Sequence, residues 1–325
     1  MKAYKGFDED MTCRGFQYEE GKEYEEKAAV LCITGFHACL NPLDTFKYYD
    51  PINSVYHEVE LDGHIESHST TDVKVDSKLC ATKIKIGPAI ELSDYIAKAV
   101  EYMSDNLTEV DYSKLTGFIT TFQADKSRCD NVSTLADVVC GSGFRSLATT
   151  FYQDNIAVNT GFCSAANTHS RDCIAVTNGS CSVSVAHGDF STATSNGNKS
   201  VTENYGDYGL SVQMGSFSIA DSIGKRSVSI NGGGFGKAQA SGEDSSAIVA
   251  GKYSEAVVKE KGAIACALGN DCRAKGCIGS WLLLTEWECT CEGSERKDTK
   301  LFYVDGEKVK ADTFYKLHDG ELVKA

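Results

Sequence analysis

The chain has 325 residues, 42% of them hydrophobic, and a formal net charge of −14, so it can form two or three units with hydrophobic cores and is not disordered. Residues 1–142 hold 25 acidic against 14 basic side chains, while 143–277 hold 11 of each. This balance argues against direct nucleic-acid binding. Because no apolar run approaches a bilayer span and the N-terminus is charged, we expect no contact with a membrane and a cytoplasmic location.

Residues 1–125 predict a head domain of helices and strands, of the α+β class. The elements expected from alternation, helical spacing and the Asn41-Pro42 helix start are a strand at 2–7, a short helix at 42–49, strands at 54–61 and 80–86, and a helix at 89–107.

The head concentrates polar and aromatic side chains that could form a nucleotide pocket. If the ligand is NAD, Arg14 and His37 would contact phosphate or ribose. Tyr48 or Tyr56 would stack on a ring, and Glu58 or Glu60 would orient a ribose hydroxyl. The alternative is that Tyr56 and Glu58 share one solvated strand face, with the histidines on a polar loop. No catalytic residue follows from either interpretation.

After a connector at 126–142, residues 143–277 divide into fifteen units of nine residues. Many units carry Gly at the first place, Ser at the fourth and a small residue at the sixth. A nine-residue unit suits one tight turn and one short strand, which predicts a parallel β-solenoid. The fourth, sixth and eighth places should face a thin interior, and the fifth and seventh should face outward.

The outward places differ between alternate units, so we predict two units per coil and two sheets back to back. One sheet carries a face of β-branched and aliphatic residues, which we call the apolar face: Ile156, Val158, Ile174, Val176, Leu210, Val212, Val228, Ile230, Ile248 and Ile264. The other sheet becomes polar toward its C-terminal end. Because such a patch is unusual on a soluble monomer, we expect the head, the tail or another copy of the chain to cover it, and we favour a homo-oligomer.

Residues eighteen apart should stack on successive coils. This predicts a column of Phe217, Phe235 and Tyr253, a His169–His187 pair and a Cys163–Cys181 pair. We interpret the aromatic column as ladder packing. The alternative is a platform for a base or a sugar.

Residues 278–325 predict a small cap of β-hairpins, with turn signals at Asp305-Gly306 and Asp319-Gly320. Such a cap would block the open end of the last coil.

The fourteen cysteines are scattered without a CxxC pair, which indicates reduced thiols. Cys32, His37 and Cys39, or Cys289 with Cys291, lack a matching second pair of ligands. The sequence therefore predicts neither a metal nor a cofactor.

The motifs KAYKGF, MTCRGFQYEEGKEYE and GFHACLNPLDTFKYY, with the tail VDGEKVKADTFYKLHDGELV, resemble an uncharacterised family encoded by bacteriophages and prophages. In that family a similar head precedes a variable number of Gly/Ser/Ala-rich repeats. The resemblance implies a phage or prophage origin and a place in the host cytosol, and no activity. The order of elements in the head is also loosely similar to compact ADP-ribosyltransferase folds, although no catalytic triad can be mapped.

Three hypotheses of function follow. The first is a non-enzymatic interaction protein that binds a host or phage protein, for example to inhibit a host defence system, with the solenoid as a rigid docking or oligomerisation surface. The second is an ADP-ribosyl-transferring or NAD-cleaving head on a solenoid stalk. The third is a virion fibre component that binds surface glycan.

Overall fold

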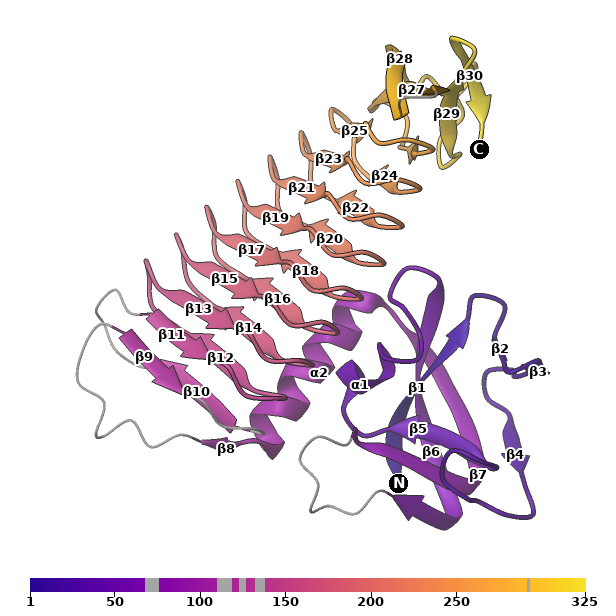
Figure 1. Ribbon diagram of the computed structural model, residues 1–325, viewed down its shortest axis with the longest axis vertical. Helices are drawn as coiled ribbons and strands as arrows, with labels where there is room; N and C mark the ends of the chain where they lie inside the picture. Colours follow the sequence, from indigo (N-terminus) through magenta and orange to yellow (C-terminus); the bar gives the residue numbers. More distant parts are fainter. Residues whose placement is uncertain (68–75, 110–118, 123–126, 132–137, 291–292) are drawn as a thin grey trace.

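The computed structural model describes residues 1–67, 76–109, 119–122, 127–131, 138–290 and 293–325. It contains an α+β head, a parallel β-solenoid and a small β cap (Figure 1). The predicted fold class is confirmed.

Four strands of the head close into a ring. They are β1 (Lys2–Asp8), β5 (Phe36–Cys39), β6 (Ser54–Ser67) and β7 (Lys78–Ile90). β1 and β7 each pair antiparallel with both β5 and β6, and β4 (Glu23–Glu25) adds to β7. Phe7, Val59, Leu61 and Ile86 fill the interior. The small hairpin of β2 (Thr12–Cys13) and β3 (Phe16–Gln17) lies apart from this ring.

Two helices connect the ring to the solenoid. α1 (Pro42–Thr45) is capped by Asn41, whose Oδ1 accepts a hydrogen bond from the Leu43 amide at 3.1 Å. It is shorter than the predicted 42–49, since the chain continues in turns. α2 (Leu92–Asn106) begins later than the predicted residue 89, because β7 still pairs with β6 at Ile90.

The solenoid consists of two long parallel sheets. The sheet next to α2, which we call the head-side sheet, contains β8 (Thr108–Glu109), β10 (Ser127–Asn131), β12 (Leu147–Thr150), β14 (Ala165–Thr168), β16 (Val183–Ala186), β18 (Val201–Asn204), β20 (Ile219–Ser222), β22 (Lys237–Ala240), β24 (Glu255–Val258) and β26 (Arg273–Lys275). The other, which we call the open sheet, contains β9 (Ile119–Phe122), β11 (Val138–Gly141), β13 (Ile156–Asn159), β15 (Ile174–Thr177), β17 (Thr192–Ser195), β19 (Leu210–Gln213), β21 (Val228–Asn231), β23 (Ser246–Val249), β25 (Ile264–Ala267) and β27 (Trp281–Thr290).

The strand register confirms the coil of eighteen residues. Ile156 pairs with Ile174 in the open sheet, and Leu147 pairs with Ala165 in the head-side sheet. The ladders begin earlier than the predicted residue 143. They include β8 and β9, within the range predicted as head, and β10 and β11, within the range predicted as connector. Arg128 on β10 pairs with Leu147, nineteen residues away, so the nine-residue repeat of the sequence does not extend to this strand.

The interior of the solenoid is thin and filled by small side chains. Sixth-place alanines such as Ala157, Ala175 and Ala193 are fully buried. Most fourth-place serines bridge two coils. Ser164 Oγ, for example, accepts from the Ser146 amide at 3.0 Å and donates to the Gly143 carbonyl at 3.2 Å. The predicted orientation of the small residues is therefore correct.

The head covers the outer side of the head-side sheet. Ile96 and Met103 of α2 share one buried cluster with Leu147 and Val183 of the first coils. Fully buried Asp44 in α1 accepts a hydrogen bond from Arg145 at 2.5 Å, and also from the amide and hydroxyl of Ser77. An apolar contact and a buried ion pair thus fix the head to the N-terminal coils.

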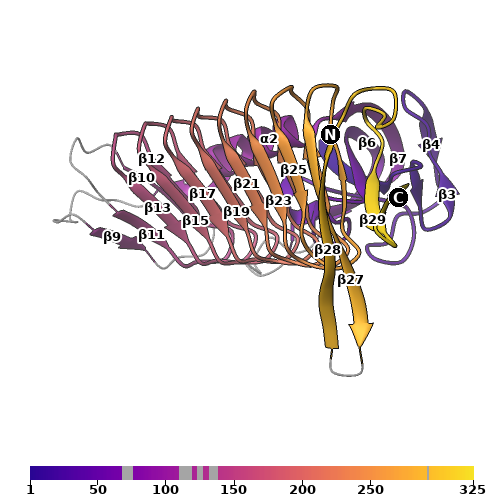
Figure 2. The ribbon, with the colours of Figure 1, turned by 90° about the horizontal axis from the view of Figure 1, so that it is seen from above.

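The cap extends both sheets. β27 pairs with β25 and then runs beyond it as one arm of a hairpin with β28 (Gly293–Tyr303), which projects past the edge of the solenoid (Figure 2). β29 (Tyr315–His318) and β30 (Glu321–Lys324) continue the head-side sheet beyond β26. Asp319-Gly320 connects β29 to β30, whereas Asp305-Gly306 lies in a turn after β28.

In the described part of the chain, no helix is long and apolar enough to cross a bilayer.

Candidate interaction face and interdomain pockets

The two tyrosines proposed for the nucleotide pocket lie in different environments. Tyr56 is buried, stacks on Tyr95 with ring centroids 4.5 Å apart, and donates to the Tyr49 carbonyl at 2.9 Å. Burial raises the pKa of Tyr56 well above its ordinary value. Tyr48 is half exposed and donates to the carboxylate of Asp76. Tyr56 therefore belongs to the contact between head and solenoid and does not lie on a solvated strand face.

The charged candidates lie on the ring of strands. His37 on β5 accepts from the Cys32 amide through Nε2 at 2.8 Å, and its Nδ1 lies 3.1 Å from the Gly35 carbonyl. Burial, followed by the charge of Lys5, lowers the pKa of His37. Glu58 on β6 pairs with Lys2 at 2.8 Å, while Arg14 and Glu60 are exposed.

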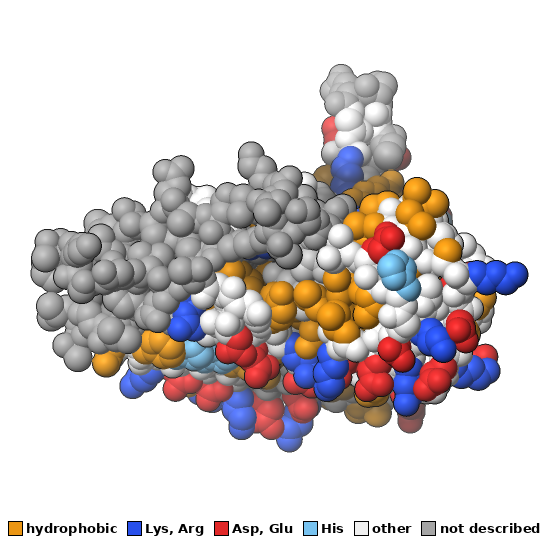
Figure 3. Space-filling model, turned by 90° about the horizontal axis from the view of Figure 1, so that it is seen from below, with side chains coloured by type: hydrophobic (Ala, Val, Ile, Leu, Met, Phe, Trp, Pro, Cys, Tyr) orange, Lys and Arg blue, Asp and Glu red, His pale blue; other side chains and the backbone are white. Residues whose placement is uncertain are grey.

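None of the six candidates lines either of two pockets found among the described residues, one of about 440 Å³ and one of about 300 Å³. The nucleotide pocket thus stays a prediction. The surface near β4 and β7 instead carries paired charges, Lys83–Glu25 at 3.2 Å and Lys85–Glu23 at 3.8 Å. Acidic and basic side chains are interspersed along the lower rim of the molecule in Figure 3.

The apolar face points outward, as predicted, and the head lies on the opposite sheet. Ile174 is 38% exposed, and the other nine residues of the face are partly exposed. Between them on β17 and β23 lie only Thr192, Thr194 and Ser246. From β11 to β25 none of the outward places of the open sheet holds a charged residue.

The cap extends this face with four further apolar side chains, which we call the hairpin extension: Trp281, Leu283, Leu301 and Tyr303. Trp281 is opposite Tyr303 and Leu283 is opposite Leu301, so all four share the outer side of the open sheet. The rings of Trp281 and Tyr303 lie 4.8 Å apart, and Leu301 is 54% exposed. The sequence did not reveal this extension, because the nine-residue period ends before β27.

The far end of the head-side sheet is polar. The outward places of β22, β24 and β26 hold Lys237, Gln239, Glu255, Arg273 and Lys275, with Val257 as their one apolar side chain. Arg273 Nε donates to Glu255 at 2.9 Å. The first coils of this sheet carry an apolar outer side, and there the head covers it. The two faces of the solenoid therefore differ sharply in polarity.

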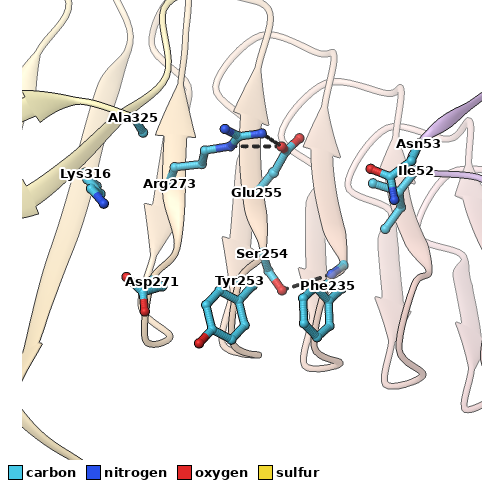
Figure 4. A pocket seen from close by; sticks show the side chains of 11 residues that line it. Ile52, Asn53, Phe235, Tyr253, Ser254, Glu255, Asp271, Arg273, Lys316 and Ala325 are labelled. Atoms are coloured by element: carbon cyan, nitrogen blue, oxygen red, sulfur yellow. Dashed lines mark hydrogen bonds and ion pairs between the residues drawn. The ribbon is translucent and has the colours of Figure 1, made fainter. Parts of the chain in front are cut away.

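A pocket of about 440 Å³ lies where head, solenoid and cap meet (Figure 4). Ile52 and Asn53 of the head line one side, and Lys316 and Ala325 of the cap line the other. The Glu255–Arg273 pair lies between these sides, and Phe235, Tyr253 and Asp271 come from the turns.

The predicted stacks are present along the turns. Phe217, Phe235 and Tyr253 stack with centroids 5.1 Å apart, and His169 stacks on His187 at 4.9 Å. Because the aromatic rings use their faces to contact one another, they present mainly their edges to solvent. This geometry favours ladder packing over a stacking platform for a ligand.

The comparisons with known proteins bear on the head. The model of a domain of unknown function, DUF7666, matches residues 1–98. No curated protein and no solved structure matches the chain. The match therefore covers the head as far as the first half of α2, and the solenoid and the cap lie outside it.

Proposed function

We propose that the protein is a non-enzymatic interaction protein whose open sheet is an assembly surface for a second copy of the chain. The supporting observation is that the apolar face and the hairpin extension form one uncharged surface, which the head leaves uncovered. A contiguous apolar surface of this kind is unusual on a soluble monomer and marks a site of interaction.

The size of this surface fits a dimer. Ten strands from β11 to β28, spaced about 4.8 Å apart and about 13 Å wide over four residues, give roughly 600 Å² on each copy. Burying it on two copies removes roughly 1,200 Å² from water, which exceeds the approximately 1,000 Å² that a specific interface needs.

The chemistry of the surface also fits self-association. A flat uncharged sheet is complementary to itself, and two such sheets pack face to face about 10 Å apart. A two-fold axis across the middle of the face would place Val212 and Ile230 near their own counterparts, as in an isologous interface.

Light scattering after size-exclusion chromatography tests this proposal. We expect the native chain to have twice the monomer mass, and the double variant Val212→Asp and Ile230→Asp to be a monomer with unchanged circular dichroism, because like charges would face one another without water. Lys252→Asp, in an exposed turn, is the matched control and should remain dimeric. A native chain that runs as a clean monomer at micromolar concentration contradicts the proposal.

The phage or prophage origin that the resemblance implies extends the proposal. The head would then bind a host or phage protein, and inhibition of a host defence system is the purpose we propose. Expression of the full chain should raise phage plating on hosts that carry the susceptible defence system. Unchanged plating across a panel of such systems would exclude this purpose.

Two other functions stay predictions. Nicotinamide release from NAD above that of a Glu58→Ala variant would support an NAD-cleaving head. Trimers present in purified virions would support a glycan-binding fibre.

A further inference from the structure

A second pocket, of about 300 Å³, lies between α2 and the first coils. Ile96 and Val100 of α2 and Leu147 and Val185 of the head-side sheet give it apolar walls. Along one side, the rings of four successive coils stack with centroids 4.9 to 5.0 Å apart: Phe151, His169, His187 and Tyr205. The volume is at the lower end of the range for small-molecule sites, and such sites favour junctions between domains.

The oxygen of one buried side-chain amide in this pocket lacks a hydrogen-bond partner. Asn167 is 3% exposed; its Nδ2 lies 3.0 Å from His169 Nε2, and its Oδ1 has no partner. In this orientation Nδ2 donates to His169 Nε2, and Oδ1 is the atom that can accept a hydrogen bond from a ligand. Leaving such a group unpaired in the folded protein is unfavourable, so a ligand that donates a hydrogen bond to it would gain affinity.

A buried carboxyl lies in the same pocket. Glu203 is 1% exposed and accepts a hydrogen bond from the Tyr205 hydroxyl at 2.8 Å. Burial, followed by the charge of Asp221, raises the pKa of Glu203 to about 8. The carboxyl is therefore protonated at neutral pH, and a nearby cation would favour its ionised form.

The lining of the pocket favours a positive ligand. It contains the carboxyls of Glu101 and Glu203 and no lysine or arginine. Burial, followed by His169, lowers the pKa of His187 to about 4, so that ring is neutral. Several titratable or charged groups surround Glu203. Tyr205 follows its strand directly, Asp221 lies on β20, and His169 and His187 belong to the ring stack. Asp94 and Glu101 lie on α2, and Arg128 donates to Ser104 at the edge of the lining.

We propose that this pocket binds a small organic cation, a protonated primary amine on a compact apolar body. The ammonium group would donate to the Glu203 carboxylate and to the Asn167 amide oxygen, and the apolar body would lie against Ile96, Val100 and Val185. Hydrogen bonds between charged groups are stronger than those between neutral groups, and the apolar walls reduce the competition of water for these hydrogen bonds. This site is independent of the open sheet and of the proposed dimer.

Isothermal titration with benzylamine, and with benzyl alcohol as its uncharged counterpart, tests the proposal on the full chain. We expect one site per chain and at least tenfold tighter binding of benzylamine. Glu203→Gln should remove that preference, since a neutral amide cannot form the ion pair. Glu255→Gln, at an outward place of the same sheet but outside the pocket, should leave it unchanged.

Proton release gives a readout that needs no variant. At about pH 6.5 each bound amine should release close to one proton as Glu203 ionises, measured from titrations in buffers of different ionisation enthalpy. Equal affinity for the amine and the alcohol, or absence of amine binding, would overturn the proposal.

Discussion

At the scale of single residues, two places of the nine-residue unit explain why the coils can stack: the glycine at the first place and the serine at the fourth. A Cβ on the first-place Gly161 would lie 1.8 Å from the carbonyl oxygen of Gly143, one coil below. The fourth-place serine then joins the backbones of adjacent coils through its hydroxyl, as Ser182 does with Gly161 and Ser164. Glycine permits the close approach of the coils, and serine supplies hydrogen bonds where the strands end.

Two adjacent glycines provide a matched test of this account. A Cβ on Gly233 would lie 2.0 Å from the Gly215 carbonyl, whereas on Gly234 the nearest atom within 4 Å is at 3.6 Å. We expect Gly233→Ala to reduce the free energy of unfolding by roughly 2 kcal/mol or more, and Gly234→Ala to change it by less than about 0.5 kcal/mol. Urea denaturation measures both, and equal effects would contradict the steric explanation.

Glu203 predicts a pH dependence of stability. Its pKa is about 8 in the folded state against an ordinary 4.5, so the folded state holds the proton more tightly. The free energy of unfolding should therefore fall as pH rises from about 4.5 to about 8 and then stay level, with a total loss of a few kcal/mol. Glu203→Gln should reduce this slope and raise the melting temperature at pH 8. Parallel pH profiles of melting temperature for the two proteins would exclude the effect.

At the scale of elements, the contact of α1 and α2 with the first coils decides which sheet is covered. Asp44 and Arg145 are 101 positions apart, and both side chains are nearly inaccessible to water. Lys47 adds to this contact, since its ammonium lies 5.4 Å from the ring centroids of both Phe144 and Phe162. This charged contact lies beside the apolar cluster of α2.

Breaking the buried pair should loosen the head. Asp44→Ala leaves Arg145 and Ser77 without their acceptor, so we expect a loss of about 3–5 kcal/mol. The double variant Asp44→Ala and Arg145→Ala should lose less than the sum of the single variants, because no unpaired charge remains. Thermal unfolding of the three variants measures the coupling, and simple additivity would contradict it.

At the scale of the whole molecule, the solenoid is a nearest-neighbour array in which each coil supports the next. A coil contributes one strand to each sheet. The solenoid can therefore be lengthened or shortened only in steps of eighteen residues if every later strand is to stay in its own sheet. We call this assignment of alternate units to the two sheets the phase of the repeat, and it matters because the two faces differ in polarity.

Deletions test the phase directly. Removal of 224–241, one full coil with β21 and β22, should give a folded chain with a native-like circular dichroism spectrum. Removal of 224–232 alone would place every later strand, including Arg273 and the cap, in the opposite sheet. We expect the second variant to lose cooperative unfolding, and equally stable variants would show that the phase is unimportant.

The nine-residue repeat alone was enough to predict the coil of eighteen residues and the side-chain stacks, because both depend on contacts between residues eighteen positions apart. It also predicted which places face inward, because side chains alternate along each short strand. The sequence by itself also identified the apolar face, from Ile156 to Ile264. Only the tertiary structure decided which sheet the head covers, since Leu147 and Val183 are as apolar as Ile174 and Val212. The pocket with Asn167 and Glu203 likewise exists only because α2, far away along the chain, lies across the first coils.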